Sequence, residues 1–400
     1  MVAVLPAIAE MLCIAGLAQQ AIGSALIRAP APAPAPAHAV ALPPISILKP
    51  LHGNEPLLDS ALESFFLLDY PEFQIVFGAE NPDDPALAIV ADLCRRYPGI
   101  DVTVVSGPTP PGRNRKVANL IAMLPGAKHE TLVVSDADIH VAPDFLAAIA
   151  AALSRPGTGL VTTLYTGLPA SPVLPSLLGA MQINHLFLPG AALAHRLGRR
   201  DCLGATMALT RKTLATIGGF AGLLDHLADD NVLGRRVRAL GQTVALAPTI
   251  PATSVTETRF TPLIHHELRW ARTIRALVPV AYWGMTLQFP LFWAAAALVF
   301  AGFATWAWIG LALAAGLRYA LARHLEHRLG LAGGRAKSPA LAKTAAPWLF
   351  LLRDGLSAVI FIASFGSDTV EWRGHVLQAD SGRGTDIPAP PPAHELGSMR

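Results

Sequence analysis

Between residues 44 and 275, short apolar runs alternate with amphipathic stretches of helical length. Seven of the runs have the length and residue types of β-strands, at residues 45–49, 74–78, 102–105, 131–135, 159–164, 206–209 and 243–247. The amphipathic stretches that predict helices between them lie at residues 55–68, 85–97, 114–124 and 143–153. This alternation predicts an α/β domain, in which helices cover both faces of a mostly parallel sheet.

Apolar segments of a length suited to a membrane flank this domain on both sides. Residues 1–28 predict a retained N-terminal membrane anchor. A cleaved signal peptide is the alternative, but no basic region precedes the apolar run. Residues 276–317 carry no charge and predict either a two-helix hairpin or an interfacial helix that ends near Pro290 before one long span. A last membrane segment is expected at residues 345–366.

The remaining segments differ from the domain in composition. Residues 29–43 form an Ala/Pro-rich stretch, which predicts a stiff, extended linker. Residues 318–344 hold six Lys and Arg side chains against Glu326, which predicts a basic loop on the cytoplasmic side and favours the hairpin over a single span. Residues 367–400 are rich in Gly and Pro and predict a disordered tail.

The composition is that of a membrane protein. Hydrophobic residues make up 52% of the chain, charged residues make up 15%, and the mean hydropathy is +0.43, which is too apolar for an ordinary soluble enzyme. Arg353 and Asp354 interrupt the last apolar segment, where they are costly unless they pair with each other or pack against protein. Three widely spaced cysteines predict free thiols in a reducing compartment.

The most informative polar residues are Asp136 and Asp138, which directly follow the predicted strand at 131–135. The carboxyl ends of parallel strands carry the ligand sites of doubly wound sheets. Two carboxylates placed there can hold a Mg²⁺ or Mn²⁺ ion, which in turn can bind a diphosphate. An ordinary turn at a strand end is the alternative interpretation of the pair.

Other polar clusters follow strands or open helices. An acceptor oxygen of Asn81, Asp83 or Asp84 can bind the N3–H of a uracil, or the cluster forms a turn and a helix cap. The cations of residues 112–119 can reach a diphosphate, or they form a solvated helix start. Asp230 precedes a predicted helix, where a carboxylate often serves only as a cap.

Motifs that the chain lacks argue against several classes of function. The chain has no GxxxxGK[ST] motif and no GxGxxG after a strand, so the usual nucleotide-binding loops are absent. It also has no basic patch interleaved with aromatic residues, which argues against nucleic acid as a partner.

The order of these motifs resembles the inverting glycosyltransferases with a GT-A-type, Rossmann-like fold. The chain is most similar to the ceramide-glucosyltransferase family and its bacterial relatives associated with hopanoid biosynthesis. The resemblance covers residues 45–374 and rests on SILKPLHGNEP (46–56), ENPDDPA (80–86), GRNRKVANL (112–120), SDADI (135–139), CLGATMAL (202–209), HLADDN (226–231), HELRWART (266–273) and SFGSDTVEWRG (364–374).

The resemblance implies a role for each motif. Asp136 and Asp138 hold the metal, and Asp230 is the general base. The residues implied in donor binding are Asn81, Asp83, Asp84, Lys116, Asn119, Asp136, Arg269 and Trp270. The chain departs from the family at two positions, because Asn81 stands where relatives have an acid and His266 stands where they have Gln or Arg.

The reaction implied by the resemblance is inverting transfer of a sugar from a UDP-sugar to a hydroxyl of a membrane lipid. The expected cofactor is Mg²⁺ or Mn²⁺. The expected location is the bacterial inner membrane, with the catalytic domain in the cytoplasm. The bacterial-type motifs favour N-acetylglucosamine transfer to a bacteriohopane polyol. Transfer of glucose from UDP-glucose to ceramide is the alternative, and a catalytically inactive membrane scaffold is the third hypothesis.

Overall fold

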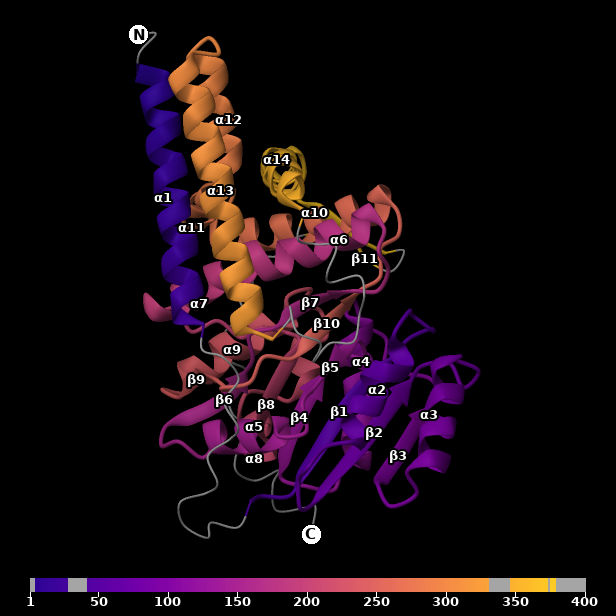
Figure 1. Cartoon of the computed structure of the whole chain (residues 1–400). Coiled ribbons are helices and arrows are strands. Elements are labelled where there is room, and N and C mark those ends of the chain that lie inside the picture. The colour runs from indigo at the N-terminus through magenta and orange to yellow at the C-terminus, as the bar shows by residue number, and fades with distance from the viewer. Residues whose placement is uncertain (1–3, 28–41, 331–345, 373–374, 379–400) are drawn as a thin grey trace.

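A seven-stranded sheet organises the α/β domain in a computed structural model that describes residues 4–27, 42–330, 346–372 and 375–378 (Figure 1). The strand order is β3-β2-β1-β4-β8-β6-β9. The strands are β1 (Ile45–Leu51), β2 (Phe73–Ala79), β3 (Asp101–Ser106), β4 (Thr131–Ser135), β6 (Thr158–Thr162), β8 (Thr206–Thr210) and β9 (Thr243–Leu246). Only β8 runs antiparallel to its neighbours in this sheet, so the predicted, mostly parallel sheet is confirmed.

Helices cover both faces of this sheet, as the sequence predicts. The helices on one face are α2 (Leu58–Phe66), α3 (Ala86–Arg96) and α5 (Phe145–Leu153). Those on the other face are α4 (Arg115–Met123), α8 (Arg211–Thr216) and α9 (Asp229–Ala239), with the short η1 (Leu124–Gly126) and η3 (Phe220–Leu223). Each face has its own apolar core, because successive side chains of a strand point to opposite faces. On β4, Val133 joins the first core and Val134 the second.

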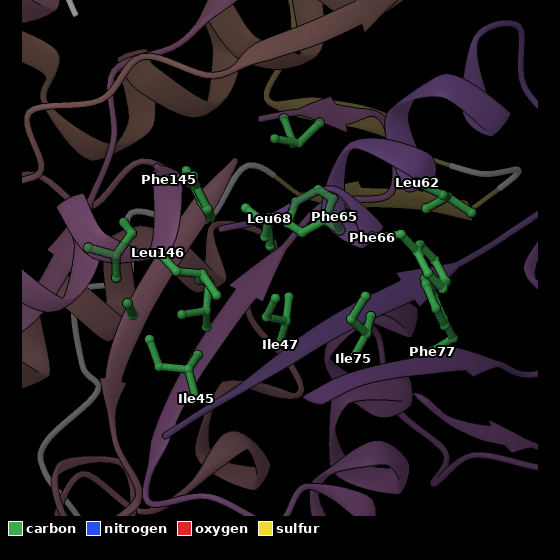
Figure 2. Close-up of a cluster of buried hydrophobic side chains, with 14 of the residues drawn as sticks. Ile45, Ile47, Leu62, Phe65, Phe66, Leu68, Ile75, Phe77, Phe145 and Leu146 are labelled. Atoms are coloured by element: carbon green, nitrogen blue, oxygen red, sulfur yellow. The ribbon is translucent and has the colours of Figure 1, made fainter. Parts of the chain in front are cut away.

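Figure 2 shows the first of these cores, where aromatic side chains from α2 and α5 lie over β1 and β2. Phe65 and Phe145 are fully buried, and their rings meet edge to face with centroids 6.0 Å apart. Burial of such a side chain stabilises the fold by about 1.5–3 kcal/mol. This packing gives the carboxyl ends of β1 and β4 a rigid base.

A second, three-stranded sheet lies beyond the end of β4. It consists of β5 (Ile139–His140), β10 (Ala252–Val255) and β7 (Thr166–Pro169), in that order. The sequence analysis predicted none of these strands, because they are two to four residues long and show no alternating pattern. This small sheet places β10 directly against the turn that carries Asp136 and Asp138, where Ser254 N donates to Asp138 O at 3.1 Å.

Helices α1 (Val4–Leu26), α12 (Pro290–Phe300) and α13 (Thr305–Arg328) stand side by side as a bundle on the α/β domain (Figure 1). Their outer faces are apolar, with Ile14 66% exposed and Leu313 70% exposed. Between the bundle and the sheet lie α6 (Leu174–Gln182), the π-helical η2 (Ile183–Phe187), α7 (Leu188–Arg196) and α10 (Phe260–Leu277). The remaining helices are α11 (Pro279–Tyr282), η4 (Trp283–Gln288), α14 (Pro347–Ala363) and η6 (Ser364–Gly366).

Within the described part of the chain, three helical segments could cross a membrane by length and composition. They are Val4–Leu26, Leu174–Arg196 and Pro347–Gly366. The pair Pro279–Gln288 and Pro290–Phe300 makes a fourth if the two helices, bent by 73°, count as one span. The sequence analysis did not predict the helix at 174–196. Most of this segment is buried, with 67% of its most apolar 18-residue stretch inside the protein. Its polar residue Asn184 hydrogen-bonds to both backbone groups of Gly167.

Two expectations about the C-terminal region are corrected. Residues 318–344 are not a loop from the start, because α13 continues to Arg328. The prediction ended the membrane helix at its first charge, but Arg318 is buried and its guanidinium faces His185 O at 3.2 Å. The tail is ordered in part, since β11 (Thr369–Trp372) pairs with β12 (His375–Gln378). The expected linker at 29–43 lies mostly outside the described residues.

The packing of α1 predicts a sensitive position at Gly23. A Cβ atom there would overlap with the carbonyl oxygen of Pro189 on α7, and this backbone atom cannot rotate away. Gly23→Ala should therefore lower the melting temperature in detergent by several degrees. Gly316→Ala on α13 is the matched control, because a Cβ there meets nothing within 4 Å and Ala is the better helix former. Equal melting temperatures for the two variants would contradict the docking of α1.

Candidate active site

Asp136 and Asp138 lie in the turn between β4 and β5, and two strands fix their positions. From β1, Lys49 Nζ donates to Asp136 O at 2.5 Å. From β10, the Thr253 hydroxyl donates to the Asp138 carboxylate. Burial, together with the nearby charge of Asp136, raises the pKa of Asp138 to about 6. The turn thus holds both carboxylates at the carboxyl end of β4, and their role as a metal site stays a prediction.

Lys116 brings positive charge to this pair from the first turn of α4. The helix is capped by Asn114, whose side-chain oxygen accepts from Val117 N at 3.1 Å. Lys116 Nζ lies 2.5 Å from Asp136 Oδ1. Burial alone would lower the pKa of Lys116, but the carboxylates of Asp136 and Asp229 outweigh it and hold the pKa above its usual value. Lys116 is thus a permanent cation at the acidic pair.

The two acids that open α9 have different surroundings. Asp229 is buried, and its Oδ1 accepts from Asn114 Nδ2 at 3.1 Å, which ties α9 to α4. Asp230 Oδ1 accepts from the neighbouring Asn231 N at 2.7 Å. Removal from water, together with the nearby charge of Asp229, raises the pKa of Asp230 to about 7. A carboxylate with a pKa near 7 is suited to act as a general base.

The HELRW segment lies on α10, between the sheet and the membrane-type helices. His266 Nδ1 lies 2.5 Å from Glu257 Oε1, and its ring meets the ring of Trp270 with centroids 4.3 Å apart. Trp270 also packs against the apolar cluster that includes Tyr165 and Phe187. His266, at the position where the family has Gln or Arg, therefore packs against the motif's own tryptophan.

The predicted uracil-binding cluster forms the turn and cap that the sequence analysis gave as its alternative. Asn81 Oδ1 accepts from Asp83 N at 3.0 Å, and both residues are exposed. Asp84 is buried, and its carboxylate accepts from Gly53 N at 2.9 Å and from the first residue of α3, Ala86 N, at 2.9 Å. These bonds occupy Asn81 and Asp84 with local structure, and donor binding by this cluster stays a prediction.

Asn119 has a similar structural task. Its Nδ2 donates to Gly78 O on β2 at 2.8 Å, and the side chain is buried between α4 and the sheet. A Cβ on Gly78 would collide with Asn119 and Met123, so glycine is required for this close approach. A contact between Asn119 and a nucleotide stays a prediction.

Two residues at the site were not singled out from the sequence. Lys49 is fully buried, 3.8 Å from the centroid of the Phe65 ring, and burial lowers its pKa to about 7. A lone lysine inside an apolar strand was the available signal, because lysine is almost never fully buried without a partner. Tyr165 follows β6. Burial raises its pKa, and the charges of Asp230, Asp136 and Asp138 raise it as well.

The arrangement supplies hard oxygen ligands and positive charge in one place. Among the described residues, no group of three or more His, Cys, Asp and Glu side chains is arranged to hold a metal ion. A cation on Asp136 and Asp138 would therefore need further ligands, and the oxygens of a diphosphate are of the right chemical type. Lys116 lies beside the same pair, where it can also face a diphosphate.

Comparison with known proteins gives a match over most of the chain. Residues 8–385 match the family described as Glycosyl transferase family 21. Ceramide glucosyltransferase 3 of Caenorhabditis elegans is 24% identical over 245 residues, which are 60% of this chain and 52% of that protein. Ceramide glucosyltransferase of Komagataella phaffii is 31% identical over 115 residues, which are 28% of this chain and 23% of that protein. The matched segments thus span about half or less of these relatives.

Two solved structures are similar at low sequence identity. The mannosyltransferase PcManGT from Pyrobaculum calidifontis, in complex with GDP-Man and Mn²⁺, aligns with a TM-score of 0.44 and 19% identity, over 89% of this chain and 99% of that one. Glucosyl-3-phosphoglycerate synthase from Mycobacterium tuberculosis, with Mn²⁺, UDP and phosphoglyceric acid, aligns with a TM-score of 0.37 and 20% identity, over 58% of this chain and 76% of that one.

The raised pKa of Asp230 predicts a pH-dependent cost of folding. Below about pH 4 the carboxyl is neutral in both states, and above pH 7 folding must remove a charged group from water. As the pH rises through this window, wild type should lose stability relative to Asp230→Asn, which melting temperatures in detergent from pH 4 to 8 would measure. The control is Asp83→Asn, at an exposed position. The difference between its melting temperature and that of wild type should be the same at every pH. A pH-independent offset for Asp230→Asn would contradict the assigned environment.

Proposed function

The chain belongs to glycosyl transferase family 21, and from this premise we propose that it transfers a sugar from a UDP-sugar to a hydroxyl of a membrane lipid, with inversion at the anomeric carbon. One observation carries the proposal. Asp136, Asp138 and Asp230 share a site with Lys116, on a domain that is joined to helices able to cross a membrane. An acid pair for a diphosphate and a base for a hydroxyl are the two groups that this reaction needs.

Asp230 is the proposed general base. An inverting transfer has one chemical step, in which a base takes the acceptor proton while the new bond to the sugar forms. A pKa near 7 lets Asp230 be charged in much of the population at neutral pH and still accept a proton. Asp229 is the less suitable candidate, because its Oδ1 is engaged by Asn114 and its role is to join α9 to α4.

Asp136 and Asp138 are the proposed holders of the divalent metal. When bound there, Mg²⁺ or Mn²⁺ would neutralise charge on the leaving nucleoside diphosphate. Lys116 adds a fixed positive charge beside Asp136. Arg269 on α10 is the second proposed cation for this group, supported by the effect of its charge on Tyr165 and Glu257. Asn81, Asp83 and Asp84 at the end of β2 remain the candidates for contact with the uracil.

A lipid acceptor fits the position of the site. Trp270, Tyr165 and Phe187 form an apolar cluster with η2, between the acids and the membrane-type helices. A lipid could present its hydroxyl along this cluster while its tail stays in the bilayer. Arg196 and Arg328 lie in the last turns of α7 and α13, and this basic bias supports the proposal that the domain lies on the cytoplasmic side of a bacterial inner membrane.

The proposed acceptor is a bacteriohopane polyol and the proposed sugar is N-acetylglucosamine. The matched ceramide glucosyltransferases support ceramide with glucose as the second candidate. An inactive scaffold is disfavoured by the complete set of acids. Mass spectrometry of total lipids from cells with and without the protein tests all three: a hexosamine on a hopanoid, a hexose on ceramide, or no change in glycolipids.

The metal assignment predicts the behaviour of Asp138→Ala. This variant should keep the fold but lose turnover by about 10² or more, because a metal that stabilises developing charge contributes several kcal/mol to the barrier. UDP release from a UDP-sugar, in detergent with extracted lipid and MnCl₂, is the measurement. The control is Asp92→Ala, which removes a carboxylate from the exposed face of α3. Full activity in excess chelator would refute the metal requirement.

The base assignment predicts a contrast between two neighbours. Asp230→Asn keeps size and hydrogen bonding but cannot accept a proton, so UDP affinity should stay within a few-fold and lipid glycosylation should fall by roughly 10² or more. Asp229→Asn should be milder. Calorimetry with UDP and lipid mass spectrometry on both variants would measure the two effects. An inactive Asp229→Asn beside an active Asp230→Asn would move the base to Asp229, and two active variants would overturn the inverting mechanism.

A further inference from the structure

Helix α14 carries two adjacent charged residues that are completely buried, Arg353 and Asp354. The sequence analysis expected the two side chains either to pair with each other or to pack against protein. They do not pair with each other. Instead each is matched by a group on another helix. Because a buried charge without a partner is strongly destabilising, these contacts determine where α14 can lie.

Arg353 binds the helix that carries the HELRW segment. Its Nη1 and Nη2 donate to Glu267 Oε1 and Oε2, each at 2.7 Å, so the pair is bidentate. Nη1 also donates to Leu178 O on α6 at 3.1 Å, and Nε donates to Ser357 Oγ at 3.2 Å. Glu267 is itself only 5% exposed. A bidentate guanidinium–carboxylate pair fixes orientation as well as distance, which a purely apolar contact does not.

Asp354 binds the opposite side, toward the bundle. Its Oδ2 accepts from Leu291 N at the start of α12 at 2.9 Å, and its Oδ1 lies 3.6 Å from Arg318 Nη2 on α13. Arg318 Nη1 in turn reaches Gln20 Oε1 on α1 at 3.5 Å. In Figure 1, α14 is seen along its axis, beside α10 and across the direction of the bundle. Two consecutive residues of α14 thus connect α10 to the bundle.

The position of Glu267 on α10 gives this connection a consequence for the site. Residues two apart on an α-helix point in directions about 200° apart. Arg353 binds α10 through Glu267, and this side of the helix faces away from the side that carries Arg269. Trp270, about one turn after Glu267, packs against the buried cluster of Ala180, Ile183 and Val255. A rotation of α10 about its axis would move Arg269 and Trp270 together relative to Asp136 and Asp138.

We propose that Arg353 and Glu267 are a positioning pair, which fixes the rotation of α10 so that Arg269 faces the donor diphosphate. The inference rests on the proposed role of Arg269 in donor binding. Burial of an ion pair often contributes little to stability compared with apolar side chains of the same volume. The function assigned to the pair is therefore orientation, and stability and donor affinity should separate when both charges are removed.

The test compares single and double variants of the full-length protein in detergent, by UDP calorimetry in MnCl₂ and by melting temperature. Arg353→Met leaves the Glu267 charge buried alone and is expected to unfold the protein. The double variant Glu267→Leu with Arg353→Met buries no charge, so its melting temperature should return near that of wild type. Its affinity for UDP should remain about tenfold or more below wild type, because small misplacements of positioning groups have effects of this size or larger.

Two further variants complete the design. Arg353→Lys keeps the positive charge but cannot bind both carboxylate oxygens of Glu267 in a fixed orientation. This variant should fold and should bind UDP more weakly than wild type. Arg323→Gln on α13 removes another arginine–carboxylate pair, with Glu326, and should leave UDP affinity unchanged. Recovery of both melting temperature and UDP affinity in the double variant would overturn the proposal and reduce the pair to a stabilising contact.

The proposed function and the positioning role can fail separately. UDP binding does not depend on the acceptor, so a wild type that binds UDP but produces no glycolipid would refute lipid glycosylation and leave the pair testable. Arg269→Ala is the check on the shared premise. If it binds UDP as tightly as wild type, Arg269 is not in the donor site and the positioning proposal is overturned with that assignment.

Discussion

The concentration of negative charge at the end of β4 is the constraint on which the site depends. Asp136, Asp138, Asp229 and Asp230 are drawn together from a turn and a helix start, and each is partly or wholly removed from water. Such a cluster is stable only if positive charge accompanies it. Lys116 meets the acids from α4 and Lys49 from β1 beneath them. A bound divalent ion would supply the rest of the compensation during the proposed reaction.

Unequal compensation gives the acids different properties. Lys116 Nζ lies 2.5 Å from Asp136 Oδ1, whereas removal from water raises the pKa values of Asp138 and Asp230. Asp138 shares the turn after β4 with Asp136, and a cation bound there would favour its charged form. Asp230 opens α9, and its pKa of about 7 suits a proton acceptor. In the proposed mechanism, carboxylates of the same chemical type therefore take different roles according to their surroundings.

The same rule governs the buried charges of α13 and α14. Arg318 on α13, and Arg353 and Asp354 on α14, are each matched by a group far away in the sequence, such as Gln20, Glu267 or Leu291 N. The polar contacts tie the bundle, α14 and α10 into one body with the catalytic domain. In the positioning proposal, the orientation of α10 depends on α14, which would link the proposed chemistry to the surface that would hold a lipid acceptor.

The sequence by itself determined the local structure and the kinds of chemical group. Each of the seven predicted strands overlaps an observed one, because a strand's apolar pattern is set by neighbouring residues in the chain. Asp136, Asp138 and Asp230 were identified as acids placed at strand and helix ends for the same local reason. The tertiary structure decided what depends on distant residues. It engaged Asp229 with Asn114, bound Asp84 to Gly53 N, 31 residues away, and paired Arg353 with Glu267, 86 residues away. Burial and pairing set the pKa and orientation of a side chain, and both arise only when separate segments pack together.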